Sequence, residues 1–317
     1  MVHYTNHPIP MKTPVQSLPR LTAFLILTVF AGLSPLSAQQ LRVSVEGTIG
    51  GEGVGAGEFL QPSSVSVDPA GGLYVADTGN HRIEWFDPDG LFLAQMGGFG
   101  FETRQLNQPM AVDATGLNVY VADTLNRRVL RFDRQLNAIG TIHDLDDTPF
   151  GFIRGVAVSG IGDLYLIDSE NEEILKVNTS RRVELRFGGF SHGAGRLKKP
   201  GGIAVDRHGN VYVADTGNSR IAVYDPFGAF VRAVGTGTLN QPEGIDVDDS
   251  GRLFVADTGN NRIVIFSEEG LVLLAFGAHG DGPGSFEAPR AIAARPDGVF
   301  FVADTGNNRI QRLRLNE

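Results

Sequence analysis

Short apolar runs separated by polar turn residues recur along most of the chain. Between residues 202 and 234 the runs are GIAVD (202–206), VYVAD (211–215), RIAVY (220–224) and AFVRAV (229–234). The runs are rich in Val, Ile, Tyr and Phe, whereas the segments between them carry the Asn, Asp, Gly and Pro of tight turns. This pattern predicts a four-stranded antiparallel meander.

The unit occurs six times. The string VADTGNHRI at 75–83 returns as VADTLNRRV at 121–129, LIDSENEEI at 166–174, VADTGNSRI at 213–221, VADTGNNRI at 255–263 and VADTGNNRI at 302–310. A near-constant period of this size is typical of repeat architectures, whose units cover one another's apolar faces. Because six such sheets placed radially close on themselves, we expect an all-β, six-bladed β-propeller of four-stranded antiparallel blades.

The two ends of the chain predict how the ring closes. The sixth copy stops after its third strand, 309–313, and too few residues follow for a fourth. Residues 41–49 precede the first copy and are followed by GGEGVGAGEFLQP, which matches the GAHGDGPGSFEAP that follows a fourth strand at 277–289. We therefore expect this N-terminal strand to complete the last blade.

The string VADTGNxRI with a preceding GIAVD strand resembles the NHL repeat family of six-bladed propellers, from about residue 41 to residue 315. The family includes protein-binding and RNA-binding modules, sensor domains and a few enzymes such as peptidyl-hydroxyglycine amidating lyase, so the resemblance implies a fold more than a function. The third copy departs from the pattern, because Glu173 stands where the other five have arginine.

The repeated aspartate and arginine are predicted to be structural. An Asp that closes a strand can accept hydrogen bonds from the turn amides after it, and an Arg five residues later can return a charge-assisted bond. A device present in every blade belongs to the scaffold, so a binding site is expected where the repeat is broken. The structural set is Asp77, Asp123, Asp168, Asp215, Asp257, Asp304, Arg82, Arg128, Arg220, Arg262 and Arg309.

Residues 1–38 are predicted to be a secretory signal peptide. They contain no acidic residue, and the apolar run Leu21 to Leu33 is shorter than the roughly 20 residues that span a bilayer. Small residues at 34–38 resemble a cleavage region, and an uncleaved signal anchor is the alternative. We expect a secreted or periplasmic protein in which residues 39–317 form a single propeller, with no membrane span after cleavage.

Charge and composition exclude several kinds of partner and chemistry. The net charge is −9, and the first 38 residues contribute only the basic Lys12 and Arg20, which disfavours a nucleic-acid partner. The absence of cysteine excludes disulfides, thiolate metal sites and a catalytic thiol. No catalytic set of nucleophile, base and orienting partner is evident in the sequence.

Two motifs match the sequences of known sites but lack the secondary structure that those sites require. GFSHG at 189–193 fits G-x-S-x-G, but that nucleophile elbow needs a strand–turn–helix. DVDDSG at 246–251 resembles a calcium loop, but an EF-hand needs flanking helices. Asp246 is still unusual, because the aligned positions of the other copies carry Ser66, Ala111, Ala157, Ala204 and Ala293.

Loops after the second and fourth strands of a blade emerge on one face and bring together two candidate groups. Six carboxylates at the third blade, with no compensating arginine expected, could bind Ca²⁺ or a basic partner segment. The alternative is a solvated belt of ion pairs with the basic residues at 196–199. The six are Asp144, Asp146, Asp147, Glu170, Glu172 and Glu173.

Four histidines on the same face form the second candidate group, as ligands of a metal. They occupy unmatched repeat positions with no motif that joins them, so ordinary surface histidines are the alternative. They are His81, His143, His192 and His279. We therefore expect a rigid module that binds a protein or another ligand on this face. The alternative is a metal-assisted lyase or hydrolase, similar to the amidating lyase, with its site at the channel mouth.

Overall fold

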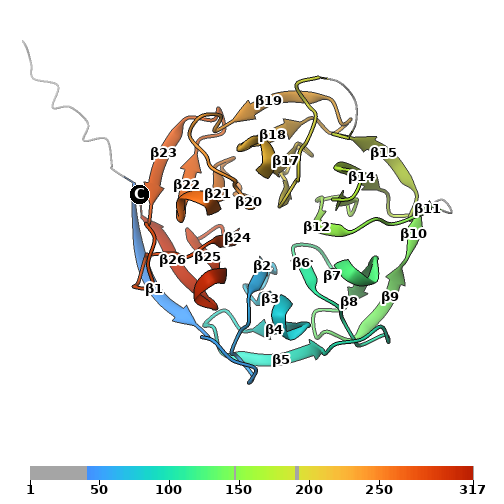
Figure 1. The fold of residues 1–317 in the computed structure, drawn as a ribbon, viewed down its shortest axis with the longest axis horizontal. Helices are drawn as coiled ribbons and strands as arrows, with labels where there is room; N and C mark the ends of the chain where they lie inside the picture. The colour runs from blue at the N-terminus through green and yellow to red at the C-terminus, as the bar shows by residue number, and fades with distance from the viewer. Residues whose placement is uncertain (1–40, 146–147, 190–192, 317) are drawn as a thin grey trace, which may run out of the picture. The chain divides into compact units, whose positions relative to one another are not determined.

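The computed structural model describes residues 41–145, 148–189 and 193–316. These residues form six four-stranded antiparallel sheets arranged radially around a central axis (Figure 1). In every sheet the first strand lies next to the axis and the fourth lies at the periphery. The predicted all-β, six-bladed propeller is confirmed.

Each blade is a meander whose strands follow the apolar runs of the sequence. Blade 1 holds β2 (Pro62–Val67), β3 (Leu73–Asp77), β4 (Arg82–Phe86) and β5 (Phe92–Gly97). Blade 2 holds β6 (Pro109–Asp113), β7 (Val119–Asp123), β8 (Arg128–Phe132) and β9 (Ala138–Ile142). Blade 3 holds β12 (Ile153–Val158), β13 (Leu164–Asp168), β14 (Glu173–Val177) and β15 (Val183–Phe187).

The second half of the ring repeats this order. Blade 4 holds β16 (Ile203–Val205), β17 (Val211–Asp215), β18 (Arg220–Tyr224) and β19 (Phe230–Val234). Blade 5 holds β20 (Gly244–Val247), β21 (Leu253–Asp257), β22 (Arg262–Phe266) and β23 (Val272–Phe276). Blade 6 holds β24 (Pro289–Ala294), β25 (Val299–Asp304), β26 (Arg309–Asn316) and β1 (Arg42–Ile49). A short hairpin of β10 (Asp144–Leu145) and β11 (Thr148–Pro149) joins blades 2 and 3.

Closure of the ring follows the prediction. The N-terminal strand β1 pairs antiparallel with β26, from Arg42 opposite Asn316 to Ile49 opposite Ile310. Figure 1 shows β1 in blue on the outer side of the red blade 6. The carboxylate of Glu46 on β1 accepts hydrogen bonds from the guanidinium groups of Arg312 and Arg314 on β26. The first and last described strands of the chain therefore share one sheet.

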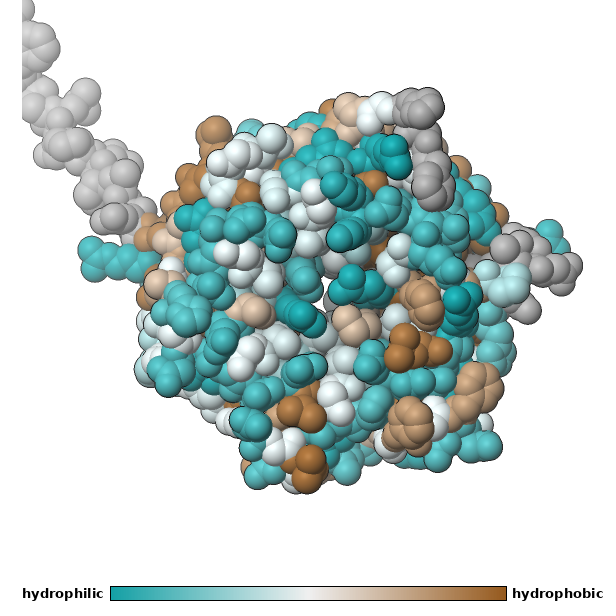
Figure 2. Space-filling model, in the orientation of Figure 1, coloured by the Kyte–Doolittle hydropathy of each residue, from teal (hydrophilic) through white to brown (hydrophobic). Residues whose placement is uncertain are grey.

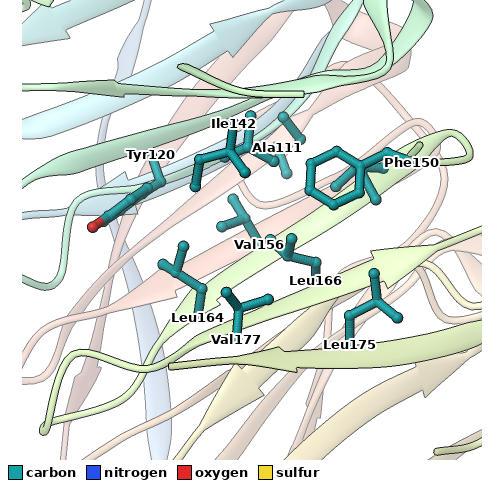
Figure 3. Close-up of a cluster of buried hydrophobic side chains, with 12 residues drawn as sticks. Ala111, Tyr120, Ile142, Phe150, Val156, Leu164, Leu166, Leu175 and Val177 are labelled. Atoms are coloured by element: carbon teal, nitrogen blue, oxygen red, sulfur yellow. The ribbon is translucent and has the colours of Figure 1, made fainter. Parts of the chain in front are cut away.

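The core lies between neighbouring blades. Every residue of the second strands β3, β7, β13, β17, β21 and β25 is buried, because these strands have a blade packed on each face. That double burial explains why VYVA is a continuous apolar run and not an alternating one. Figure 3 shows one such contact, in which Tyr120 and Ile142 of blade 2 face Val156 and Leu164 of blade 3.

The repeated aspartate ties three segments together in blade 1. Asp77 Oδ1 accepts a hydrogen bond from the Leu60 amide (2.7 Å), and Asp77 Oδ2 accepts from the side chains of Asn80 and Arg82 (both 2.8 Å). Arg82 also donates to backbone carbonyls of residues 54, 55 and 58 in the loop from the previous blade. The turn after Asp77 is a short 3-10 helix, η1 (Thr78–Asn80). The equivalent turns of blades 2, 4, 5 and 6 are η2 (Thr124–Asn126), η3 (Thr216–Asn218), η4 (Thr258–Asn260) and η5 (Thr305–Asn307).

Candidate functional site

The face that carries the turns after the second strands and the loops after the fourth strands is called the loop face below. Figure 2 shows it, with hydrophobic side chains exposed over blades 1 and 2 and at the rim beside blades 4 and 5, and hydrophilic ones over much of the remainder. Three regions of this face bear on function: the third-blade turn, a surface cluster at blades 1 and 2, and the opening of the central channel.

The third blade lacks the arginine clamp, as the sequence indicated. Asp168 still closes its strand and accepts hydrogen bonds from the amides of Gly151, Glu170 and Asn171, at 3.1–3.2 Å. A Cβ on Gly151 would lie 2.2 Å from Asp168 Oδ1, so the incoming loop needs glycine there. Glu173, in the arginine position, instead accepts a hydrogen bond from Arg186 on the outer strand β15 (2.7 Å).

The acidic residues of this turn have separate partners, so the expected absence of a compensating arginine is wrong. Glu170 forms an exposed ion pair with Arg127 of blade 2 (3.3 Å), and Glu172 accepts a hydrogen bond from the Lys199 amide (2.9 Å). Asp146, Asp147 and the side chain of Asp144 lie outside the described residues. Within what is described, the carboxylates of this turn are each engaged locally.

The histidines occupy different blades. His81 follows the second-strand turn of blade 1, where its Nδ1 accepts a hydrogen bond from the Gln108 amide (3.0 Å). His143 follows β9 of blade 2, and His279 follows β23 of blade 5. His192 lies outside the described residues. No group of three or more His, Asp or Glu side chains in the described segments is arranged to hold a metal ion.

Sequence reasoning missed an exposed cluster of apolar side chains on the loop face at blade 2. Phe99 and Phe101 in the loop that enters blade 2 are 70% and 59% exposed, and Leu125 in its second-strand turn is also exposed. We call these three residues the apolar patch. His81 meets the Phe99 ring edge-on at a centroid distance of 5.2 Å, and His143 stacks on Phe101 at 6.4 Å. Two of the candidate histidines thus flank aromatic rings.

An alignment of the loops that enter the blades could have identified the apolar patch from the sequence. Backbone bridges pair Glu52 with Phe59, Phe99 with Leu106 and His279 with Phe286, which makes these three loops equivalent. Where this loop carries Phe99, the equivalent positions hold a glutamate and a histidine, both polar. Beside Phe99 lies a groove of about 330 Å³, lined by Asn80, Arg82, Gln95, Met96, Gly97, Gly98 and Arg104.

The central channel has a volume of about 850 Å³ and is lined by the first strands of all six blades. Because each first strand begins on the loop face, one residue from each blade surrounds the opening on that side. We call these six residues the channel mouth: Ser63, Met110, Arg154, Gly201, Glu243 and Arg290. Glu243 Oε2 lies 4.0 Å from Arg154 Nη2 and 3.5 Å from Arg290 Nε.

A second layer of polar residues lies deeper in the channel. Strand register pairs Asp246 with Phe254, Asp113 with Tyr120 and Ser66 with Tyr74. Asp113, and not Ala111 as the sequence alignment suggested, is therefore the equivalent of Asp246. The earlier alignment was wrong because β6 places Asp113 opposite the tyrosine of β7.

These channel residues connect the inner strands of neighbouring blades. Ser66 Oγ accepts a hydrogen bond from the amide of residue 114 (2.9 Å), Asp113 Oδ2 from that of residue 158 (3.0 Å) and Asp246 Oδ2 from that of residue 294 (2.7 Å). Burial raises the pKa of Asp113, and it raises the pKa of Asp246 to about 7. Because blades 2 and 5 are opposite in a six-bladed ring, the two carboxyl groups lie on opposite walls of the channel.

None of the helices in the described part of the chain is long and apolar enough to cross a membrane.

Comparison with known proteins places the chain among repeat proteins. The sequence profile of the NHL repeat matches residues 59–86, 197–224 and 239–266. The protein brain tumor of Drosophila melanogaster is 28% identical over 142 residues, which are 44% of this chain and 14% of that protein. Human NHL repeat-containing protein 3 is 30% identical over 172 residues, 53% of this chain and 43% of that protein. The chain thus aligns with less than half of either relative.

Among solved structures, a gluconolactonase from Xanthomonas campestris superimposes with a TM-score of 0.63. The match covers 86% of this chain and 99% of that one, at 13% identity, and it shows the fold alone. Repeat profile, blade count and sheet order agree. The chain therefore carries NHL repeats and folds as a six-bladed β-propeller.

Proposed function

We propose that the protein is a binding platform that holds a segment of a partner protein on the loop face, at the apolar patch. The exposure of Phe99 and Phe101 is the observation that supports this function. Large contiguous exposed apolar surfaces on soluble proteins usually mark interaction sites, and aromatic residues dominate binding hot spots. The rigid propeller holds both rings in place without the cost of ordering a flexible loop.

The surroundings of the patch indicate the chemistry of the partner segment. Arg104 lines the groove beside Phe99 and is exposed, and it forms no ion pair within the described residues. Arg128 lies against the ring of Phe101, with its guanidinium carbon 4.5 Å from the ring centroid. A segment that presents apolar side chains next to an acidic residue would cover the two rings and pair with Arg104.

Selection of displayed random peptides against the purified protein tests this proposal. The expected consensus combines apolar or aromatic residues with Asp or Glu. A Phe99→Ser/Phe101→Ser double variant should lose binding by at least tenfold, since hot-spot truncations cost about 2 kcal/mol or more. Phe227→Ser is the matched control, because Phe227 is 82% exposed on the opposite face. Equal binding by the wild type and the double variant would exclude the patch.

We further propose that the chain is exported, with residues 1–38 as the signal. The support is the composition of that segment, which combines an apolar run with a complete lack of acidic residues. Fractionation of a Gram-negative host that expresses the full chain should place the product in the periplasm, with a new N-terminus near residue 39. Leu27→Arg, which puts a charge within the apolar run, should keep the product in the cytoplasm. Cytoplasmic wild-type protein with an intact N-terminus would contradict export.

A further inference from the structure

The channel mouth combines two arginines and one glutamate at the opening of the channel. Arg154 comes from blade 3, Glu243 from blade 5 and Arg290 from blade 6. The blade between the first two contributes Gly201, which has no side chain to fill the space. The three charged groups leave one positive charge in excess, although the chain as a whole carries −9. Hydrophilic side chains border the centre of the loop face in Figure 2.

The pairing within this group is loose. The distances of 4.0 and 3.5 Å from Glu243 Oε2 exceed those of a charge-assisted hydrogen bond, about 2.7–2.9 Å. Arg290 Nε is buried and has no hydrogen-bond partner among the described residues. No hydrogen bond from the Arg154 side chain to another described residue is seen either. Both guanidinium groups thus have N–H groups that can donate hydrogen bonds to a planar oxyanion.

We infer that the channel mouth binds a small monocarboxylate, with its carboxylate between Arg154 and Arg290 and its body in the channel. One added negative charge neutralises the excess charge of the mouth. The channel volume of about 850 Å³ is within the range of small-molecule pockets. A carboxylate matches the fork of donors that a guanidinium presents.

The deeper layer keeps the anion at the mouth. Asp113 and Asp246 face the channel from opposite walls, and each is engaged with the backbone of the next blade. An anion that moved past the mouth would leave both arginines and approach two carboxyl groups, which supply no positive charge to hold it. The uncharged part of the ligand is therefore the part that extends inward.

Glu243 acts as an internal competitor in this arrangement. Its carboxylate lies where the ligand's carboxylate would bind, and it must move away or be displaced. Removal of its charge by Glu243→Gln should therefore tighten binding, whereas loss of either arginine should weaken it. This opposite response of neighbouring residues distinguishes an anion site from a general loss of structure.

Calorimetric titration with benzoate, and with neutral benzamide as the matched control, tests the inference. We expect heat from benzoate alone. Arg154→Gln and Arg290→Gln should each raise the Kd on the order of tenfold, which corresponds to about 1.4 kcal/mol. Arg182→Gln, at an exposed turn on the opposite face, removes the same charge from the protein and should leave the Kd unchanged.

Two further controls test where the carboxylate can come from and whether each variant is folded. A short peptide with a free C-terminus, compared with its amidated form, tests whether a chain end can supply the carboxylate. Thermal melting of each variant confirms that it is folded before titration. The inference is overturned if benzoate gives no heat, if benzamide binds as well as benzoate, if folded arginine variants bind like the wild type, or if Glu243→Gln weakens binding. The apolar patch is not involved, so its peptide binding can succeed or fail separately.

Discussion

Replacement of Glu84 by glutamine should stabilise the propeller at neutral and alkaline pH. Glu84 lies on β4 of blade 1 and is fully buried. Its Oε1 accepts a hydrogen bond from the Gly57 amide (3.2 Å) and lies 3.2 Å from Arg82 Nη2, but its Oε2 has no partner among the described residues. Burial raises the pKa of Glu84 from 4.5 to about 7, against the opposing effect of Arg82.

Blade 6 already contains the proposed replacement. Gln311 pairs with Val302 as Glu84 pairs with Val75, so the two positions are equivalent. The Gln311 amide accepts from the backbone of residue 284 (2.9 Å) and donates to the carbonyl of residue 285 (2.6 Å) and to Asp304 (3.0 Å). A glutamine in blade 1 would use the equivalent backbone groups and Asp77, which satisfies both ends of the side chain.

The pKa of Glu84 gives the size and direction of the effect. A buried acid with a raised pKa costs no stability below its unfolded value, here 4.5, because it is protonated in both states. The cost grows between pH 4.5 and about 7 and reaches about 3 kcal/mol above that, at about 1.4 kcal/mol per pH unit. Glu84→Gln should therefore raise the melting temperature by about 5–10 °C at pH 8 and much less at pH 5.

Circular dichroism melts of both proteins at pH 5 and pH 8 measure this difference. Gln311→Glu is the reciprocal variant, and it should lower the melting temperature at pH 8 while changing it little at pH 5. The reasoning fails if Glu84→Gln destabilises the protein at pH 8, because the ion pair with Arg82 would then outweigh the cost of burial.

Three further substitutions test the channel, the repeat clamp and the third blade. Asp246→Ser keeps an acceptor for the neighbouring strand, as Ser66 does, and should stabilise the protein by about 1–2 kcal/mol at pH 8 but not at pH 4; equal gains at both pH values would contradict it. Arg128→Ala, which removes a buried partner, should cost about 3–5 kcal/mol in urea unfolding, and the more exposed Arg262→Ala should cost less; equal costs would refute burial as the cause. Gly151→Ala should cost about 1–3 kcal/mol, because its Cβ meets the hydrogen-bonded carboxylate of the third-blade repeat; an unchanged melting temperature would show that the loop has room.

The fold could be predicted because each blade carries its own copy of one turn motif. The motif around Asp77 marks one turn per blade, and its count gives the number of sheets. The strand predicted at 41–49 could be assigned to the last blade because the loop after it repeats a sequence found after β23. Both inferences use local sequence alone, so they do not depend on how side chains meet.

The candidate site was harder to predict because its contacts join different blades. The ion pair of Glu170 with Arg127 links two turns 43 residues apart, and no repeat position indicates it. Asp113 and Asp246 are equivalent because each lies opposite the aromatic residue of the neighbouring strand. The sequence alignment placed Ala111 at this position, and it therefore missed the equivalence. Arg154 is part of the channel mouth only because its strand begins on the loop face, a fact of topology and not of composition.

The pairing of β1 with β26 also determines when the protein can finish folding. Arg42 and Asn316 are partners across almost the whole described chain, and such distant contacts carry a large loop-closure entropy and form slowly. During synthesis, β1 is made before blades 1 to 5, and it waits for β26, which is made after them. Until the two strands pair, each presents an unpaired edge that can add to another chain, so late closure of blade 6 is a step exposed to misassembly.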